Sequence, residues 1–369
     1  MFPSNPTKRI LSNLSVFLAG FIVALILCEI ILRMLPGILY YRPFEILAVY
    51  DENIGHMVFK KGARIKMRMP YGDLVAISYN NTSIEKEPHN VVFNVDSCGF
   101  RNDSNYHGQK YVLVGDSFIF GAADSQEDIL SSQLKNKYNI DVYNVSFTGD
   151  IFHYVKFIKE FEKRAKSDFK VLLFIYEGND FNDAPPDNFG RKNKLQFIRD
   201  TFTYRFLKIR YHLLRGRYQA LKTQAPGRVK VIKINGHKVG FLDSRIGTAE
   251  DSEYKGSEGF ESALSVISPK VAHIFFIPEK YRVYYSFIEG SHSGYLPNTH
   301  WEYLASLCKK LNLKATNLTE PLIRESEELM KKDIMTWWKD DTHWNKYGIA
   351  VAAKIVAETL KTETQNIQY

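Results

Sequence analysis

Residues 111–118 of this 369-residue chain read Tyr-Val-Leu-Val-Gly-Asp-Ser-Phe, an apolar run that ends in a glycine, an acid and a serine. The run Tyr111–Val114 has the length and composition of a buried strand. Gly115 allows a tight turn after it, so Ser117 is predicted to follow the carboxyl end of the strand. In a parallel sheet, ligands bind at that end, and backbone N–H groups there can stabilise an oxyanion. Ser117 is therefore a candidate nucleophile, although a serine that only caps the next helix would leave the same pattern.

Strand-like and helical patterns alternate through most of the chain after this strand. Further strands are predicted at residues 141–147, 171–176, 271–277 and 314–318. The third of the series, 171–176, is almost continuously apolar, which is typical of a parallel sheet that is covered on both faces. Helices are predicted at residues 127–138, 152–166, 299–311, 320–331 and 345–360. The alternation predicts an α/β fold, a three-layer flavodoxin-like sandwich with a parallel sheet.

Further candidate site residues follow the predicted strands at the edge where Ser117 is expected. Gly149 comes after the second strand, and Asn179 comes after the third. Before the last helix, the stretch Asp340-Asp-Thr-His343 places a histidine two and three residues after carboxylates. A serine nucleophile needs a base, and the base needs an acid that fixes its tautomer. Each piece alone could be a turn or a helix cap, but the four together favour a site for acyl transfer.

These four blocks make the chain resemble the SGNH hydrolase family, also called GDSL-type esterases. The matching blocks are Gly115-Asp-Ser117, Gly149, Gly178-Asn-Asp180 and the Asp-Asp-Thr-His of residues 340–343. The resemblance covers about residues 100–360, apart from a basic insertion. It implies an enzyme, either a serine esterase or an O-acyltransferase.

The resemblance also implies roles for individual residues. Ser117 would be the nucleophile and His343 its base. The oxyanion hole would consist of the backbone N–H groups of Ser117 and Gly149 and the side chain of Asn179. The commonest family pattern makes Asp340 the acid of the triad, whereas a subgroup that includes polysaccharide O-acetyltransferases has the acid two residues before the histidine, at Asp341. We prefer Asp341 and keep both as candidates.

The N-terminal region contains an apolar run at residues 14–32, preceded by Lys8 and Arg9. Extended back by four residues, the run is long enough to cross a hydrocarbon core of about 30 Å as a helix. Glu29 and Arg33 are four residues apart and are expected to pair near the membrane surface. A cleaved signal peptide is the alternative, but no small-x-small cleavage pattern follows the run. The preceding cations favour a cytoplasmic N-terminus, with the body periplasmic or extracellular.

Basic residues concentrate in one segment. Between Arg191 and Gly240 the chain has 14 Lys or Arg and one acid. The rest of the chain carries 35 basic and 40 acidic side chains, so the net charge of +8 arises in this segment. Strand-like runs around Asn235-Gly236 predict a β-hairpin within it. Such a segment can bind an anionic polymer, or lie on the bilayer, because residues 202–221 mix Phe, Tyr and Leu with Arg and Lys. A solvated face without a partner is the third interpretation.

The predicted domain organisation follows from these patterns. It comprises a cytoplasmic tail (1–9), a transmembrane anchor (10–35), a juxtamembrane region (36–106), a catalytic domain (107–190 and 265–369) and the basic insertion with its hairpin (191–264). Cys28, Cys98 and Cys308 show no metal-ligand or redox spacing. We expect no metal or other cofactor and no nucleic-acid partner, because no phosphate-binding loop or nucleic-acid module is visible.

The expected function is ester hydrolysis or acyl transfer, most simply of an acetyl group, on an extracytoplasmic glycan or a similar ester. A membrane partner that delivers the acyl group would suit a transferase. The alternative is a non-enzymatic, membrane-anchored protein that binds an anionic polymer or lipid through the basic insertion. The tryptophans near the histidine, at 337, 338 and 344, suit either stacking on a sugar or core packing.

Overall fold

The structure is a computed structural model. It describes residues 6–35, 41–78, 83–183, 198, 201–223, 228–288 and 296–366. The chain divides into two compact units, one made of residues 1–41 and 191–225 and the other of residues 42–190 and 226–369. Parts of the predicted basic insertion, at residues 191–197, 199–200 and 224–227, lie outside the described residues. The predicted boundaries of the catalytic domain and of the insertion stay predictions.

A five-stranded parallel sheet forms the centre of the larger unit. Its strands are β5 (Tyr111–Val114), β6 (Val142–Asn144), β7 (Lys170–Tyr176), β10 (Val271–Ile277) and β11 (Ala315–Asn317). Their order in the sheet is β11-β10-β7-β5-β6, and every neighbouring pair is parallel. This order is that of flavodoxin-like folds, in which ligands bind where the strand order reverses, here between β5 and β7. The predicted fold class is confirmed.

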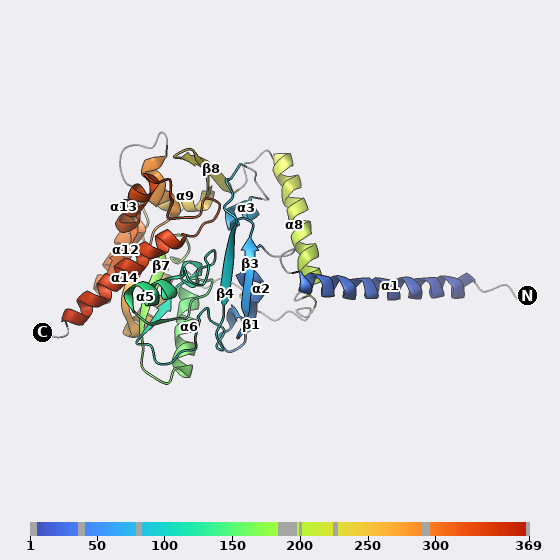
Figure 1. Cartoon of the computed structure of the whole chain (residues 1–369), viewed down its shortest axis with the longest axis horizontal. Coiled ribbons are helices and arrows are strands. Elements are labelled where there is room, and N and C mark those ends of the chain that lie inside the picture. Colours follow the sequence, from blue (N-terminus) through green and yellow to red (C-terminus); the bar gives the residue numbers. More distant parts are fainter. Residues whose placement is uncertain are drawn as a thin grey trace, which may run out of the picture. The chain divides into compact units, whose positions relative to one another are not determined.

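Helices cover both faces of this sheet (Figure 1). One face packs against α6 (Ile151–Arg164), α10 (Glu258–Ile267) and α12 (Thr299–Lys310). The other packs against α5 (Leu130–Tyr138), α13 (Thr319–Met330) and α14 (Lys346–Asn366). Alternate residues of β5 enter the two cores, since Val112 and Val114 belong to the first and Leu113 to the second. This alternation is the strand period of two, and it explains why the run is apolar throughout.

Short elements connect and flank the three layers. Before the sheet lie α2 (Pro43–Leu47), the antiparallel pair β1 (Ala48–Asp51) and β2 (His56–Phe59), α3 (Asp73–Ile77), and the antiparallel pair β3 (Arg64–Met69) and β4 (His89–Asn94). The other helices among the described residues of the larger unit are α4 (Ser117–Phe120), α9 (Asp243–Glu250) and α11 (Lys280–Tyr284), together with the 3-10 turns Ser268–Lys270 and Tyr285–Phe287.

The predicted hairpin is confirmed. Strands β8 (Val229–Ile234) and β9 (His237–Leu242) pair antiparallel around the turn Asn235-Gly236. Both turn residues have positive φ, 49° and 85°. This is the backbone that a tight two-residue hairpin turn requires and that Asn-Gly adopts readily. The hairpin belongs to the larger compact unit.

Among its described residues, the smaller unit contains the helices α1 (Pro6–Met34) and α8 (Phe202–Thr223). The most apolar 18-residue stretch within residues 13–34 of α1 has a mean hydropathy of 2.7, and none of that stretch is buried by protein, so α1 can be a signal sequence or a single membrane anchor. The predicted pair near its end forms, with Arg33 and Glu29 in contact at 2.8 Å. The three cysteines are free thiols.

Candidate active site

Ser117 lies directly after β5, as the first residue of the one-turn helix α4. Its Oγ is 2.7 Å from Nε2 of His343. Ser117 is partly exposed, whereas His343 is buried. Gly115 is needed at the turn because a Cβ on it would lie 2.6 Å from Cγ1 of Ile119. The structure thus brings together the hydroxyl and the imidazole, which are 226 residues apart in the chain.

Asp341 contacts the other nitrogen of the His343 ring. Its Oδ1 is 2.6 Å from Nδ1 and also accepts a hydrogen bond from the backbone N–H of His343 at 3.0 Å. Burial alone would raise the pKa of Asp341, but the charge and the hydrogen bond of His343 hold it well below its usual value. Burial is the largest single effect on His343 and lowers its pKa, but the charge and hydrogen bond of Asp341 and the charges of Asp73 and Asp116 together raise the pKa above its usual value. An ionised acid beside the base stabilises the imidazolium.

Asp340 has a different set of partners. Its Oδ2 accepts hydrogen bonds from the backbone N–H groups of Gly72 at 2.9 Å and Glu87 at 3.1 Å. Leu74 donates its backbone N–H to the carbonyl oxygen of Asp340 at 3.1 Å. Asp340 therefore fastens the loop of the histidine to residues 72–87. Of the two candidate acids, Asp341 and not Asp340 contacts the His343 ring with its carboxylate.

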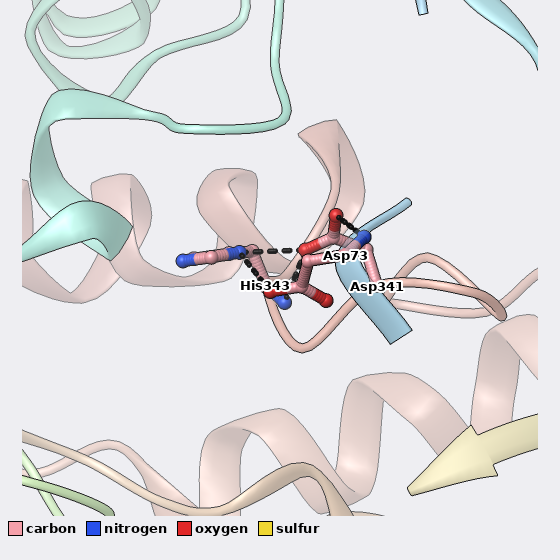
Figure 2. A group of neighbouring side chains, drawn as sticks. All are labelled: Asp73, Asp341 and His343. Carbon is pink, nitrogen blue, oxygen red and sulfur yellow. Dashed lines mark hydrogen bonds and ion pairs between the residues drawn. The ribbon is translucent and has the colours of Figure 1, made fainter. Parts of the chain in front are cut away.

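A second carboxylate, that of Asp73, also approaches the histidine. Its Oδ2 is 3.8 Å from Nδ1 of His343, and its backbone N–H donates to Oδ2 of Asp341 at 2.8 Å. Figure 2 shows both carboxylates at the same end of the His343 ring, with the other ring nitrogen pointing away. Sequence reasoning missed Asp73, because it lies in a short helix of the juxtamembrane region and no local pattern connects it with residues 340–343.

The carboxylate of Asp73 is held by Thr342. The backbone N–H of Thr342 donates to Oδ1 at 2.8 Å, and its hydroxyl donates to Oδ2 at 2.6 Å. Arg42 adds a cation, with Nη1 3.8 Å from Oδ2. Burial raises the pKa of Asp73, and the charge of Asp341 raises it further, whereas His343, Arg42 and Thr342 act in the opposite direction. The base therefore faces two acids, one in direct contact and one behind it.

The same three side chains could hold a metal ion by their chemistry. One ligand atom from each of Asp73, Asp341 and His343 lies within 4.8 Å of the other two. The four carboxylate oxygens, however, already accept hydrogen bonds from backbone N–H groups, from the ring or from the hydroxyl of Thr342. These donors would have to be displaced for a cation to bind. Hydrogen bonds among these residues and Thr342 are enough to explain why the three side chains lie close together.

The two other predicted oxyanion residues lie next to each other. Nδ2 of Asn179, which follows β7, donates to the carbonyl oxygen of Gly149 at 3.3 Å. Both residues are partly exposed, as Ser117 is. A Cβ on Gly149 would lie 2.7 Å from Cβ of His153, so a residue with a side chain does not fit at this position. Asn182 ties the two loops together, because its Nδ2 donates to Oδ2 of Asp150 and to the carbonyl oxygen of Asn179, each at 3.0 Å.

A buried lysine fixes the loop that carries the acids. Nζ of Lys280 donates to the carbonyl oxygens of Gly240 at 3.0 Å, Trp338 at 2.7 Å and Asp341 at 3.1 Å. Burial lowers its pKa to about 8. Because Gly240 belongs to β9, the hairpin is connected with the histidine loop through Lys280. A small depression lies here, bordered by Thr342 and by residues of β9, α9 and the start of α11.

The tryptophans near the histidine serve mainly in packing. Trp337 and Trp344 are fully buried in the core on the α14 side of the sheet. Trp338 stacks on the ring of His89 at 3.9 Å and donates its indole N–H to Asp124 at 3.3 Å. Of the two interpretations of these residues, core packing describes Trp337 and Trp344.

Comparisons with known proteins give distant structural similarities only. No protein-family model and no curated protein matches the chain. Among solved structures, the chain is similar to BT4096, a gut microbial diltiazem-metabolizing enzyme, with a TM-score of 0.27 and 12% sequence identity. The alignment covers 69% of this chain and 48% of that one, so the chain spans about half the length of the structure that it matches.

Proposed function

We propose that the chain catalyses serine-dependent acyl transfer, with Ser117 as nucleophile, His343 as general base and Asp341 as the acid that orients the base. The observation that carries the proposal is the continuous row of contacts, 2.7 Å from Oγ to Nε2 and 2.6 Å from Nδ1 to Asp341. Each distance is within hydrogen-bonding reach, which is the geometric condition for a nucleophile and its base. Asp340 takes a supporting role, holding the loop.

The reaction would proceed in two halves. Nε2 of His343 takes the hydroxyl proton of Ser117 while Oγ bonds to the ester carbonyl carbon. The tetrahedral oxyanion then collapses, the alcohol departs with the proton from His343, and the acyl group stays on Ser117. Water or a second hydroxyl, deprotonated by the same imidazole, attacks the acyl enzyme and releases the serine. The N–H groups of Ser117 and Gly149 and the amide of Asn179 would hold the oxyanion in both halves.

The proposed substrate is an acylated, in the simplest case acetylated, glycan or similar ester outside the cytoplasm. The apolar helix α1 supports this location, because as an uncleaved anchor preceded by Lys8 and Arg9 it would leave the larger unit on the extracytoplasmic side. As a transferase, the protein would take its acyl group from a membrane partner. The partly exposed nucleophile is accessible to a donor and an acceptor in turn.

A fluorophosphonate probe tests the nucleophile. The full-length protein should be labelled on Ser117, and Ser117→Ala should abolish both the label and the hydrolysis of a short-chain ester. Ser265→Ala is the matched control, because Ser265 is an exposed serine of α10 that bonds only to its own helix and should leave both unchanged. Equal ester hydrolysis by Ser117→Ala and the wild type would refute the proposal, and an unlabelled wild type would favour the non-enzymatic binding protein.

A second experiment separates hydrolase from transferase. The purified protein is given an acetyl ester with and without an oligosaccharide acceptor, and both free acetate and acetylated sugar are measured by mass spectrometry. Acetylated sugar that disappears in Ser117→Ala would identify a transferase. Free acetate alone, at the same rate with and without the acceptor, would identify an esterase.

A further inference from the structure

The end of the apolar helix α1 is tied to the start of α8. Glu29 accepts hydrogen bonds from the backbone N–H groups of Phe202 at 3.1 Å and Thr203 at 2.8 Å, and from the hydroxyl of Thr203 at 2.9 Å. These are the N–H groups that a helix leaves without a partner in its first turn, and a carboxylate there also suits the helix dipole. Glu29 thus caps α8, and α8 begins at the end of the segment that is able to cross a bilayer. In Figure 1, α8 leaves this end of α1 and runs across its direction.

One face of α8 is apolar and exposed. Leu207, Tyr211 and Leu214 follow the spacing i, i+4, i+7, which places them on one stripe of a helix. Their exposed fractions are 58%, 57% and 68%. Exposing large apolar side chains along one face of a helix to water is unfavourable in free energy. Such a stripe is therefore expected to contact another apolar surface.

Cations border this stripe on both sides. Lys208, Arg210 and Arg215 are exposed and lie about 60° to 100° around the helix from its centre, at the helical advance of about 100° per residue. In all, α8 contains six Lys or Arg and no acid. A polar face rich in Lys and Arg opposite an apolar stripe is typical of helices that lie in a membrane interface. The long cationic side chains can reach lipid phosphates while their stems stay against apolar groups.

We propose that α8 lies in the headgroup region of the bilayer that α1 enters, with the Leu207–Tyr211–Leu214 stripe towards the acyl chains and the flanking cations on anionic lipid. The occupant of the stripe is therefore the lipid surface itself. Charge complementarity favours it over a soluble partner, and the cap at Glu29 starts α8 at the level where the apolar run of α1 ends. The proposal is independent of the serine chemistry, since it concerns residues of the smaller unit alone.

Fluorescent labels on the full-length protein test this placement. In a background without Cys28, Cys98 and Cys308, single cysteines are introduced as Leu207→Cys or Leu214→Cys, with Val266→Cys as the matched control. Val266 is an apolar residue of α10 in the larger unit and is half exposed. Each cysteine carries an environment-sensitive fluorophore, and the protein is reconstituted into phosphatidylcholine vesicles with or without phosphatidylglycerol. Some of the lipids bear a quencher on the acyl chain.

The expected result is a blue-shifted emission at 207 and 214 that the acyl-chain quencher removes, and an unshifted, unquenched emission at 266. The quenching should increase with phosphatidylglycerol. Lys208→Gln combined with Arg215→Gln should reduce the ratio of quenched to unquenched label roughly fivefold for each charge removed. Emission at 207 and 214 that matches that at 266 would overturn the proposal. So would a blue shift without quenching, because protein would then cover the stripe.

Discussion

Replacing Asp73 by Asn tests whether the second carboxylate acts on the base. The substitution keeps the size of the side chain and removes its charge 3.8 Å from Nδ1 of His343. At an effective dielectric constant of about 20, two unit charges at this separation interact by about 4 kcal/mol. That figure is an upper bound on the effect, since Asp341 remains in direct contact and burial raises the pKa of Asp73. We therefore expect Asp73→Asn to lose roughly 10- to 100-fold in kcat/KM, or about 1.4 to 2.8 kcal/mol of transition-state stabilisation.

The pH dependence gives a more specific signature. Burial lowers the pKa of His343, but the carboxylates of Asp341 and Asp73 raise it above its usual value. Without the charge of Asp73 the pKa of His343 falls, so the neutral imidazole that accepts the serine proton is available at lower pH. The acid limb of kcat/KM against pH, which reports the base in the free enzyme, should move to lower pH.

Ester hydrolysis measured across pH for the wild type, Asp73→Asn and Thr342→Val provides the assay. Thr342→Val removes the hydroxyl that donates to Asp73 at 2.6 Å but leaves the carboxylate, so its acid limb should move in the same direction as that of Asp73→Asn and by less. Circular dichroism and the melting temperature check that each variant is folded. An acid limb and a kcat/KM of Asp73→Asn that both coincide with those of the wild type would refute the role of Asp73.

Further outcomes follow from the same geometry. Asp341→Asn should reduce kcat roughly 10⁴-fold, as expected for loss of the acid that fixes the tautomer, whereas Asp340→Ala should mainly lower stability by roughly 1–3 kcal/mol through two unpaired backbone N–H groups, as read by denaturant unfolding. Gly149→Ala should reduce kcat roughly 10²-fold with little change in KM, because its Cβ would meet a neighbouring imidazole and shift an oxyanion donor; an unchanged kcat would contradict this. Hydrogen bonds to Glu85 and Asp333 raise the pKa of His237, so its stabilisation is complete below the unfolded value near 6.5 and is lost as pH rises through the higher folded value. The melting temperature of His237→Gln should therefore fall below that of the wild type at pH 5.5 and approach it at pH 9.

Much of the sheet could be predicted from the sequence because each strand can be recognised from its own residues. The run 171–176 is apolar at every position, since β7 lies between two layers of helices and has no solvent face. The hairpin was equally local, because Asn235-Gly236 fits positive φ at both positions. Ser117 and His343 could be paired as candidates since each stands at the end of a recognisable element.

The acid side of the site could not be read in the same way. Asp340 and Asp341 are neighbours of the same chemical type, and they differ only in which way the loop turns them. Asp73 reaches the histidine only through tertiary packing, in which a Cβ on Gly72 would already lie 2.4 Å from the carbonyl oxygen of Asp340. Lys280 likewise acts through four carbonyl oxygens, one on β9 and three within residues 338–341. Contacts of this kind leave no periodicity in the sequence.

The bonds from Gly72 and Asp73 to the two aspartates join positions 268 residues apart. During synthesis Gly72 and Asp73 are made long before their partners, from which 268 residues separate them. Loop closure over such a separation is entropically unfavourable and tends to be slow. The contacts among Ser117, His343 and Asp341 can therefore form only after residues 341–343 have been made, long after Ser117, and we expect their formation to be a late step in folding.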